Sequence, residues 1–78
     1  MNKEQEIHGT IEQWHRDQVS RKEFIIYGYV YGDTKGRFPD GTYIHTSGVM
    51  NRAIKEGDIV KTRNSVYKLG EEAPENAI

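Results

Sequence analysis

Apolar and polar positions alternate most regularly in residues 24–31, which read FIIYGYVY. This segment is dense in β-branched and aromatic residues, contains no proline and is followed by a glycine, which is typical of a β-strand. Successive side chains of a strand point to opposite faces. The face that we predict to be buried carries Phe24, Ile26, Gly28 and Val30. The opposite face carries Ile25, Tyr27, Tyr29 and Tyr31.

Shorter strands are predicted farther along the chain. The segments TYIHTS, IVKTR and VYKL have strand composition, and the turn sequences DTKGRFPDG, KEGD and RNS lie before or between them. Residues 49–54, VMNRAI, fit either a continuing strand or one helical turn. We expect an antiparallel sheet over residues 23–70, with a core made of Phe24, Ile26, Val30, Ile44, Val60 and Leu69.

The N-terminal third of the chain supports two interpretations. One is a helix between residues 3 and 19, because Ile7, Ile11 and Trp14 have helical spacing and Thr10 with Gln13 would form a capping box. The other is a strand followed by a polar loop at DQVSRK. That strand would place Ile7, Gly9 and Ile11 on one face and His8, Thr10, Glu12 and Trp14 on the other. We favour the strand, because Gly9 and the polar segment WHRDQVS weaken the helix.

These elements predict an all-β or mainly β fold. We expect a small antiparallel sheet or partial barrel of four to five strands, with a short N-terminal helix as the alternative for the first segment. The chain contains no internal repeat, so residues 1–78 are interpreted as a single small domain. The charged, proline-containing tail at residues 71–78 has little to pack and is expected to fray.

Composition limits the size of the core, the chemistry and the cellular compartment that we expect for this protein. A chain of 78 residues has room for one modest core. The absence of cysteine excludes disulfides, thiolate metal sites and thiol catalysis, and it fits a reducing compartment. No apolar run is long enough to span a bilayer, and the start MNKEQEIHG lacks the apolar stretch of a signal peptide. We therefore expect a cytoplasmic protein without a membrane partner.

The order of several turn and strand residues resembles a group of small uncharacterised bacterial and phage proteins. The skeleton runs from Trp14 through DG-x-x-I-x-TS, residues 40–47, to V-x-T-x-NSVY-x-LG, residues 60–70. The resemblance spans about residues 14–70 and carries no known activity. It implies an all-β fold and a bacterial or phage setting, and it assigns no site.

No catalytic or metal-binding motif is present. His8, His15 and His45 lack the short paired spacing of a zinc site, and there is no cysteine to help them. Thr46 and Ser47 follow His45, but neighbouring residues of a strand point to opposite faces, which argues against a nucleophile with its base. The loop DTKGRFPDG lacks the ending of a phosphate-binding loop. We expect no enzyme activity, no cofactor and no metal.

The aromatic row is the strongest candidate for a binding surface. The residues that we place on or beside it are Tyr27, Tyr29, Tyr31, Arg37, Tyr43, His45, Lys61 and Arg63. Aromatic side chains among positive charges stack the bases of single-stranded nucleic acid in several β-domains. Tyrosine and arginine are also frequent anchors of protein interfaces. A third interpretation is structural, because cross-strand tyrosine pairs stabilise small sheets.

Charge balance favours a protein partner. The 11 basic residues are offset by 12 acidic ones, whereas a nucleic-acid binder of this size is usually more basic. We therefore expect a small cytosolic protein-binding module whose partner is a host or phage protein. By analogy, an inhibitor or regulator of a host defence enzyme, as anti-CRISPR proteins are, fits a phage setting. The edge strands of a small sheet could also pair with a second copy of the chain, which would form a homodimer.

Overall fold

The computed structural model describes residues 6–50 and 53–74. Within this part of the chain there are five strands and no helix, which confirms the mainly β class. The strands are β1 (Gly9–Gln18), β2 (Phe24–Tyr31), β3 (Thr42–His45), β4 (Ile59–Lys61) and β5 (Val66–Leu69). Among the described residues, no helix is present that could cross a membrane.

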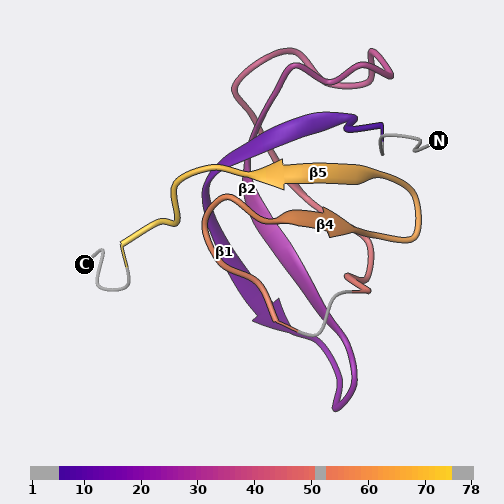
Figure 1. The fold of residues 1–78 in the computed structure, drawn as a ribbon, viewed down its shortest axis with the longest axis vertical. Helices are drawn as coiled ribbons and strands as arrows, with labels where there is room; N and C mark the ends of the chain where they lie inside the picture. Colours follow the sequence, from indigo (N-terminus) through magenta and orange to yellow (C-terminus); the bar gives the residue numbers. More distant parts are fainter. Residues whose placement is uncertain (1–5, 51–52, 75–78) are drawn as a thin grey trace, which may run out of the picture.

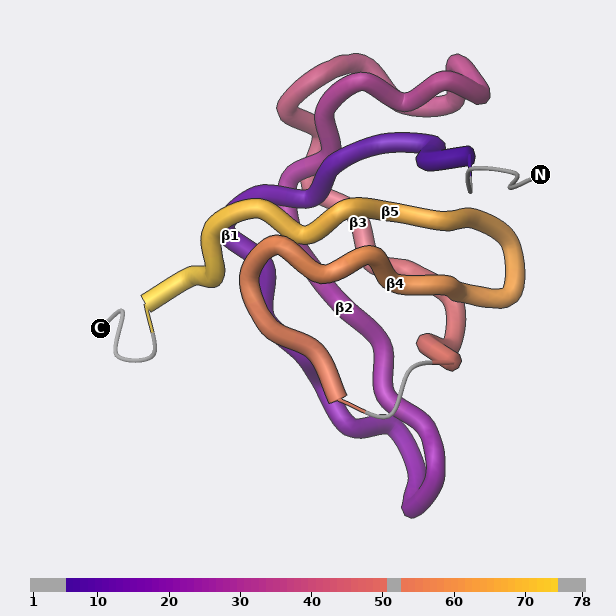
Figure 2. The backbone as a smooth tube through the Cα atoms, in the orientation of Figure 1, coloured from indigo at the N-terminus to yellow at the C-terminus, as the bar shows by residue number. Residues whose placement is uncertain are grey.

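All five strands belong to one sheet, in the order β3-β2-β1-β5-β4 (Figure 1). The sheet is mixed, because β1 and β5 run parallel while the other three neighbouring pairs are antiparallel. The prediction of a purely antiparallel sheet is therefore corrected. The β4–β5 hairpin does not continue from β3 but crosses in front of β2 and joins the far side of β1 (Figures 1 and 2).

The sheet curls on itself without closing. After β3 the chain meets the segment after β4 at a single bridge between Val49 and Thr62. Beside it, the backbone N–H of Met50 donates to the carbonyl of Lys61 at 2.8 Å. The result is a partial barrel, in which the β2–β3 layer faces the β4–β5 hairpin across the core.

A bulge in β1 determines which residues face this core. The pairing register between β1 and β2 shifts between Glu12 and His15, and Gln13 has a positive φ of 51°. The bulged residue lets both Ile11 and Trp14 point inward, although they are three positions apart. Trp14 is 1% exposed, so the expected placement of its side chain on the face opposite Ile11 was wrong.

The core predicted from the alternation is confirmed. Phe24, Ile26, Val30, Ile44, Val60 and Leu69 are all buried. Trp14, Ile11, Val49 and Tyr67 complete the cluster, and Phe38 and Ile54 pack against it. Gly28 belongs to the same face and lies under the bulge, where only a residue without a side chain fits next to the β1 backbone.

Two further expectations concern the ends of the chain. The segment Gly9–Gln18 is a strand, so the alternative of a helix is wrong for its described residues, and residues 3–5 lie outside them. The fraying expected for residues 71–78 stays a prediction. In the structure, the Trp14 carbonyl accepts the N–H of Ala73 at 2.9 Å and the Trp14 N–H donates to the carbonyl of Glu71 at 3.3 Å. These backbone bonds extend the parallel pairing beyond β5. Residues 75–78, and residues 51–52 of the VMNRAI segment, lie outside the described residues.

Changing Gly28 to Ala tests the bulge. An added Cβ would lie 3.0 Å from the carbonyl oxygen of Glu12 and 3.1 Å from Cα of Trp14, and it would overlap the Ile11 side chain. Because backbone atoms cannot move aside cheaply, we expect the free energy of unfolding to fall by about 1–3 kcal/mol in urea denaturation. Gly9→Ala is the matched control, since its closest backbone neighbour is 3.3 Å away, and it should cost clearly less. Equal losses would contradict the packing described here.

Candidate functional site

Five aromatic rings form a connected row on the outer face of the sheet, which we call the aromatic strip: His15, Tyr27, Tyr29, Tyr43 and His45. The centre of the strip is Tyr27, whose ring stacks on His15 at a centroid distance of 5.3 Å with an interplanar angle of 4°. Tyr27 also contacts Tyr43 at 6.1 Å and His45 at 5.5 Å. Tyr29 lies 4.9 Å from Tyr43. The strip therefore crosses three neighbouring strands, β1, β2 and β3.

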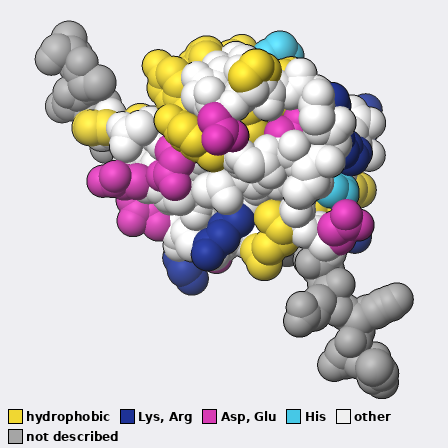
Figure 3. Space-filling view, turned by 90° about the horizontal axis from the view of Figure 1, so that it is seen from above, with side chains coloured by type: hydrophobic (Ala, Val, Ile, Leu, Met, Phe, Trp, Pro, Cys, Tyr) yellow, Lys and Arg dark blue, Asp and Glu magenta, His cyan; other side chains and the backbone are white. Residues whose placement is uncertain are grey.

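The outer surface of the strip is exposed. Tyr29 is 41% and Tyr43 is 50% exposed, and Tyr31 at the end of β2 is 43% exposed. Ile11 and Trp14, the residues of β1 with the most apolar surface, pack on the opposite face of the sheet and cover none of these rings. In the view of Figure 3, hydrophobic side chains, a class that includes tyrosine, gather at one margin of the molecule.

The charged side chains on the outer face of β1, β2 and β3 are negative. In the register of the sheet, Glu12 lies opposite Tyr29, and Asp17 lies opposite Ile25 at the other end of β1. The outer face of β1, β2 and β3 carries no lysine or arginine. Arg16, the one cation within these strands, is on the core side, where its guanidinium carbon lies 4.3 Å from the centre of the Phe24 ring.

Lys61 and Arg63, two of the basic residues predicted to border the tyrosines, lie on another wall of the partial barrel. Lys61 follows the buried Val60 in β4, so its side chain points away from the core. The strip also points away from the core, but from the layer on the opposite side. The Arg63 guanidinium is 3.2 Å from the Glu23 carboxylate, next to the β1–β2 turn. The sheet thus does not place these two cations beside the aromatic rings.

The third predicted cation, Arg37, belongs to the loop between β2 and β3 and is held there by Asp33. The Asp33 carboxylate accepts hydrogen bonds from the backbone N–H groups of Lys35, Arg37 and Phe38 at 3.2, 2.7 and 3.0 Å. It also pairs with the Arg37 guanidinium at 3.2 Å, and its side chain is fully buried. One carboxylate therefore organises the whole turn.

These hydrogen bonds change the acidity of Asp33. Burial acts to raise its pKa, but the Arg37 side chain and the three backbone donors outweigh burial and lower the pKa from 3.8 to about 2. The hydrogen bond to Asp33 raises the pKa of Arg37 in return. The loop is thus fixed with both charges present at neutral pH.

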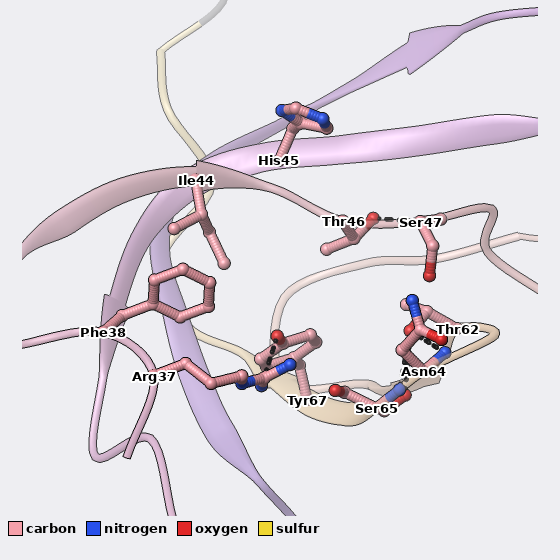
Figure 4. Close-up of a pocket in the computed structure, with 10 residues that line it drawn as sticks. All are labelled: Arg37, Phe38, Ile44, His45, Thr46, Ser47, Thr62, Asn64, Ser65 and Tyr67. Carbon is pink, nitrogen blue, oxygen red and sulfur yellow. Dashed lines mark hydrogen bonds between the residues drawn. The ribbon is translucent and has the colours of Figure 1, made fainter. Parts of the chain in front are cut away.

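Arg37 extends from this turn toward a cavity of about 180 Å³ between the β3 strand and the β4–β5 turn (Figure 4). Its guanidinium donates to the Tyr67 hydroxyl at 3.2 Å. Lys35 ties the same two segments together, since its ammonium group donates to the carbonyl of Asn64 at 2.7 Å. The cavity is lined by Arg37, Phe38, Ile44, His45, Thr46, Ser47, Thr62, Asn64, Ser65 and Tyr67.

The described histidines do not gather with other metal-ligating side chains. Within residues 6–50 and 53–74, no three side chains of the histidine, cysteine, aspartate or glutamate type come together as ligands. His8 has a structural role, because its Nδ1 atom accepts the backbone N–H of Val66 at 3.0 Å. His15 and His45 are separated by the Tyr27 ring that both contact.

Two parts of the site were missed by reasoning from the sequence. His15 joins the strip only because the bulge moves it to the outer face. The sequence signal for this was the apolar Trp14 directly before it, because a buried Trp14 places His15 on the outer face. The cavity was missed because its walls come from a loop and a turn that are distant in sequence, although Asp33 preceding a glycine-containing turn was a hint of a fixed loop.

Comparison of the chain with protein-family models, curated protein sequences and solved structures finds no match. The function is therefore inferred from the geometry of the molecule itself.

Acid titration tests the role of Asp33. Its folded-state pKa of about 2 lies below the ordinary value of 3.8, so its contribution to stability is complete above about pH 4 and is lost as the pH falls toward 2. We expect Asp33→Asn to unfold more easily than the unaltered protein at pH 7 and the difference to shrink between about pH 4 and 2, as measured by urea denaturation. Asp17→Asn, outside the loop, is the control. A difference that stays constant with pH would contradict this role.

Proposed function

We propose that this protein is a non-enzymatic protein-binding module that uses the aromatic strip and Tyr31 as its interface. The observation that carries the proposal is a connected set of tyrosine and histidine rings on an uncovered sheet face. Tyrosine combines a large contact area with few rotatable bonds and is enriched among the residues that dominate binding energies. A strip across three paired strands offers such side chains on a rigid support.

The charges around the strip favour a partner that presents lysine or arginine. The face of a tyrosine ring attracts cations, with a contribution of about 0.5–1 kcal/mol at exposed sites. Glu12 and Asp17 would add attraction from either end of β1. We therefore propose that the bound segment is positively charged and lies across β1, β2 and β3.

Single-stranded nucleic acid is the second candidate, supported by the resemblance of the strip to aromatic base-stacking surfaces. The same surroundings argue against it. Phosphates would approach Glu12 and Asp17, and the outer face of β1, β2 and β3 has no lysine or arginine to compensate these charges. Lys68 of β5, which pairs with Thr10, is exposed on the same side of the sheet. A purely structural role for the tyrosines is the third interpretation, and it predicts that no partner depends on them.

The biological setting proposed here rests on the sequence resemblance alone. A bacterial or phage protein of this kind would act in the cytoplasm as a regulator or inhibitor of a host protein, including a defence enzyme. The outer edge of β3 in this arrangement also leaves room for pairing with a second copy.

Substituting Tyr29 tests whether the strip binds a partner, because the change should weaken binding without unfolding the domain. Because Tyr29 is exposed, we expect Tyr29→Ala to change the free energy of unfolding by about 1 kcal/mol or less. As immobilised bait in a nuclease-treated bacterial lysate, the variant should lose proteins that the unaltered chain retains, quantified by mass spectrometry. Met50→Ala is the matched control, since Met50 is a large exposed residue outside the strip. Identical capture by all three baits would leave the tyrosines with a structural role.

Neutralising Glu12 and Asp17 distinguishes a protein partner from a nucleic-acid partner, because the two binding affinities should change in opposite directions. The double variant Glu12→Gln with Asp17→Asn keeps the acceptor that holds the backbone N–H of Glu71 at 2.9 Å. We expect it to weaken binding of a fluorescent lysine- and arginine-rich peptide in an anisotropy titration, because attraction is lost. Binding of a single-stranded oligonucleotide should instead strengthen, because repulsion is lost. Tighter peptide binding by the double variant would contradict the proposed partner chemistry.

A further inference from the structure

We propose that the cavity between β3 and the β4–β5 turn binds a small oxyanion, either a carboxylate or a phosphate group carried by a ligand. This site is separate from the aromatic strip, because side chains on opposite faces of β3 border the two. His45 belongs to the strip and reaches only the rim, while Ile44 and Phe38 point toward the interior of the cavity (Figure 4). The inference therefore does not depend on the proposed interface.

The cation at this site is preoriented. Asp33 fixes one side of the Arg37 guanidinium, and the Tyr67 hydroxyl accepts from the same nitrogen, Nη2, at 3.2 Å. The Phe38 ring supports the guanidinium with its centre 5.1 Å from the central carbon. Within the described part of the chain, the Nη1 and Nε atoms of Arg37 have no hydrogen-bond partner. These donors remain for a ligand, and holding them in place lowers the entropy lost on binding.

The net charge around the cavity is positive. Lys35 and Arg37 carry two positive charges against the single negative charge of Asp33. The ten residues that line the cavity include no aspartate or glutamate. An anion would therefore meet no carboxylate inside the cavity, and the oxygens of the neighbouring Asp33 are occupied by their own donors.

Hydroxyl groups supply further donors. The Ser47 Oγ atom is buried and has no hydrogen-bond partner among the described residues. The Tyr67 hydroxyl accepts from Arg37, and the Ser65 hydroxyl accepts from Lys35 at 3.4 Å, so each keeps its own proton to donate. Buried polar groups normally find partners, and an unpaired hydroxyl beside a cavity is satisfied by whatever fills that cavity. A ligand oxygen suits this set of donors.

The size of the cavity limits the ligand. A volume of about 180 Å³ is below the roughly 300–1,000 Å³ typical of sites that enclose a whole drug-sized molecule. It accommodates an oxyanion with the few atoms that attach it, such as a peptide C-terminus, an acidic side chain or a phosphate ester. The rest of the ligand would remain outside.

Nuclear magnetic resonance titration tests this site with inorganic phosphate and with acetate, at an ionic strength held constant with sodium chloride. We expect saturable shifts of the backbone amide signals of Ser47, Asn64 and Ser65 and of the Arg37 side-chain signal. Arg37→Gln should weaken the binding about tenfold, the loss expected for one charge-assisted hydrogen bond. Arg63→Gln is the matched control and should leave the affinity unchanged, because Arg63 is paired elsewhere.

Ser47→Ala tests anion binding with a variant that should fold normally, since the hydroxyl that it removes has no hydrogen-bond partner among the described residues. We expect this variant to be at least as stable as the unaltered protein and to bind the anion about threefold more weakly. Tighter binding of phosphate would identify a phosphorylated ligand, and tighter binding of acetate a carboxylate. Shifts that do not saturate, that spread equally to Arg63 and Lys22, or that persist unchanged in Arg37→Gln would overturn the proposal.

Discussion

The fold depends on the bulge in β1 that seats Trp14 in the core. If β1 kept this sequence without the bulge at Gln13, strict alternation would turn the indole outward and leave the core without its largest side chain. The bulged strand also bends, so that one end of β1 reaches β5 while its whole length follows β2. The indole N–H then donates to the carbonyl of Gly70 at 3.0 Å, which links this packing to the C-terminal segment.

This one irregularity separates two surfaces of different chemistry. After the bulge, His15 stands beside Tyr27 and completes an aromatic face bordered by carboxylates. The interior of the curled sheet opens instead at the end of β3, where Arg37 and several hydroxyl groups meet. We propose cations and aromatic contacts for the first surface and anions for the second. Under these proposals, a domain of this size would recognise two ligands of opposite charge.

The sequence predicted best where the structure is local. The strict alternation from Phe24 to Val30 defined the buried face of β2, and turn residues located the later strands, because both follow from short-range stereochemistry. The face of Trp14 was mistaken, since a single bulged residue reverses the alternation and leaves little trace in composition. The parallel pairing of β1 with β5, the positions of Lys61 and Arg63 and the cavity were also beyond prediction. Each depends on contacts between segments that are far apart in the chain.

The parallel pairing has a consequence for the order in which the molecule assembles. A short turn joins β1 to β2, so these two strands are close in sequence, whereas the other edge of β1 pairs with β5, the last strand of the sheet in chain order. The backbone N–H of Val66, the first residue of β5, donates to the ring of His8, which directly precedes β1. These two residues are 58 positions apart in the chain. Closing so long a loop is slow relative to forming a hairpin. During synthesis, the edge of β1 that faces β5 therefore stays unpaired until Val66–Leu69 have emerged.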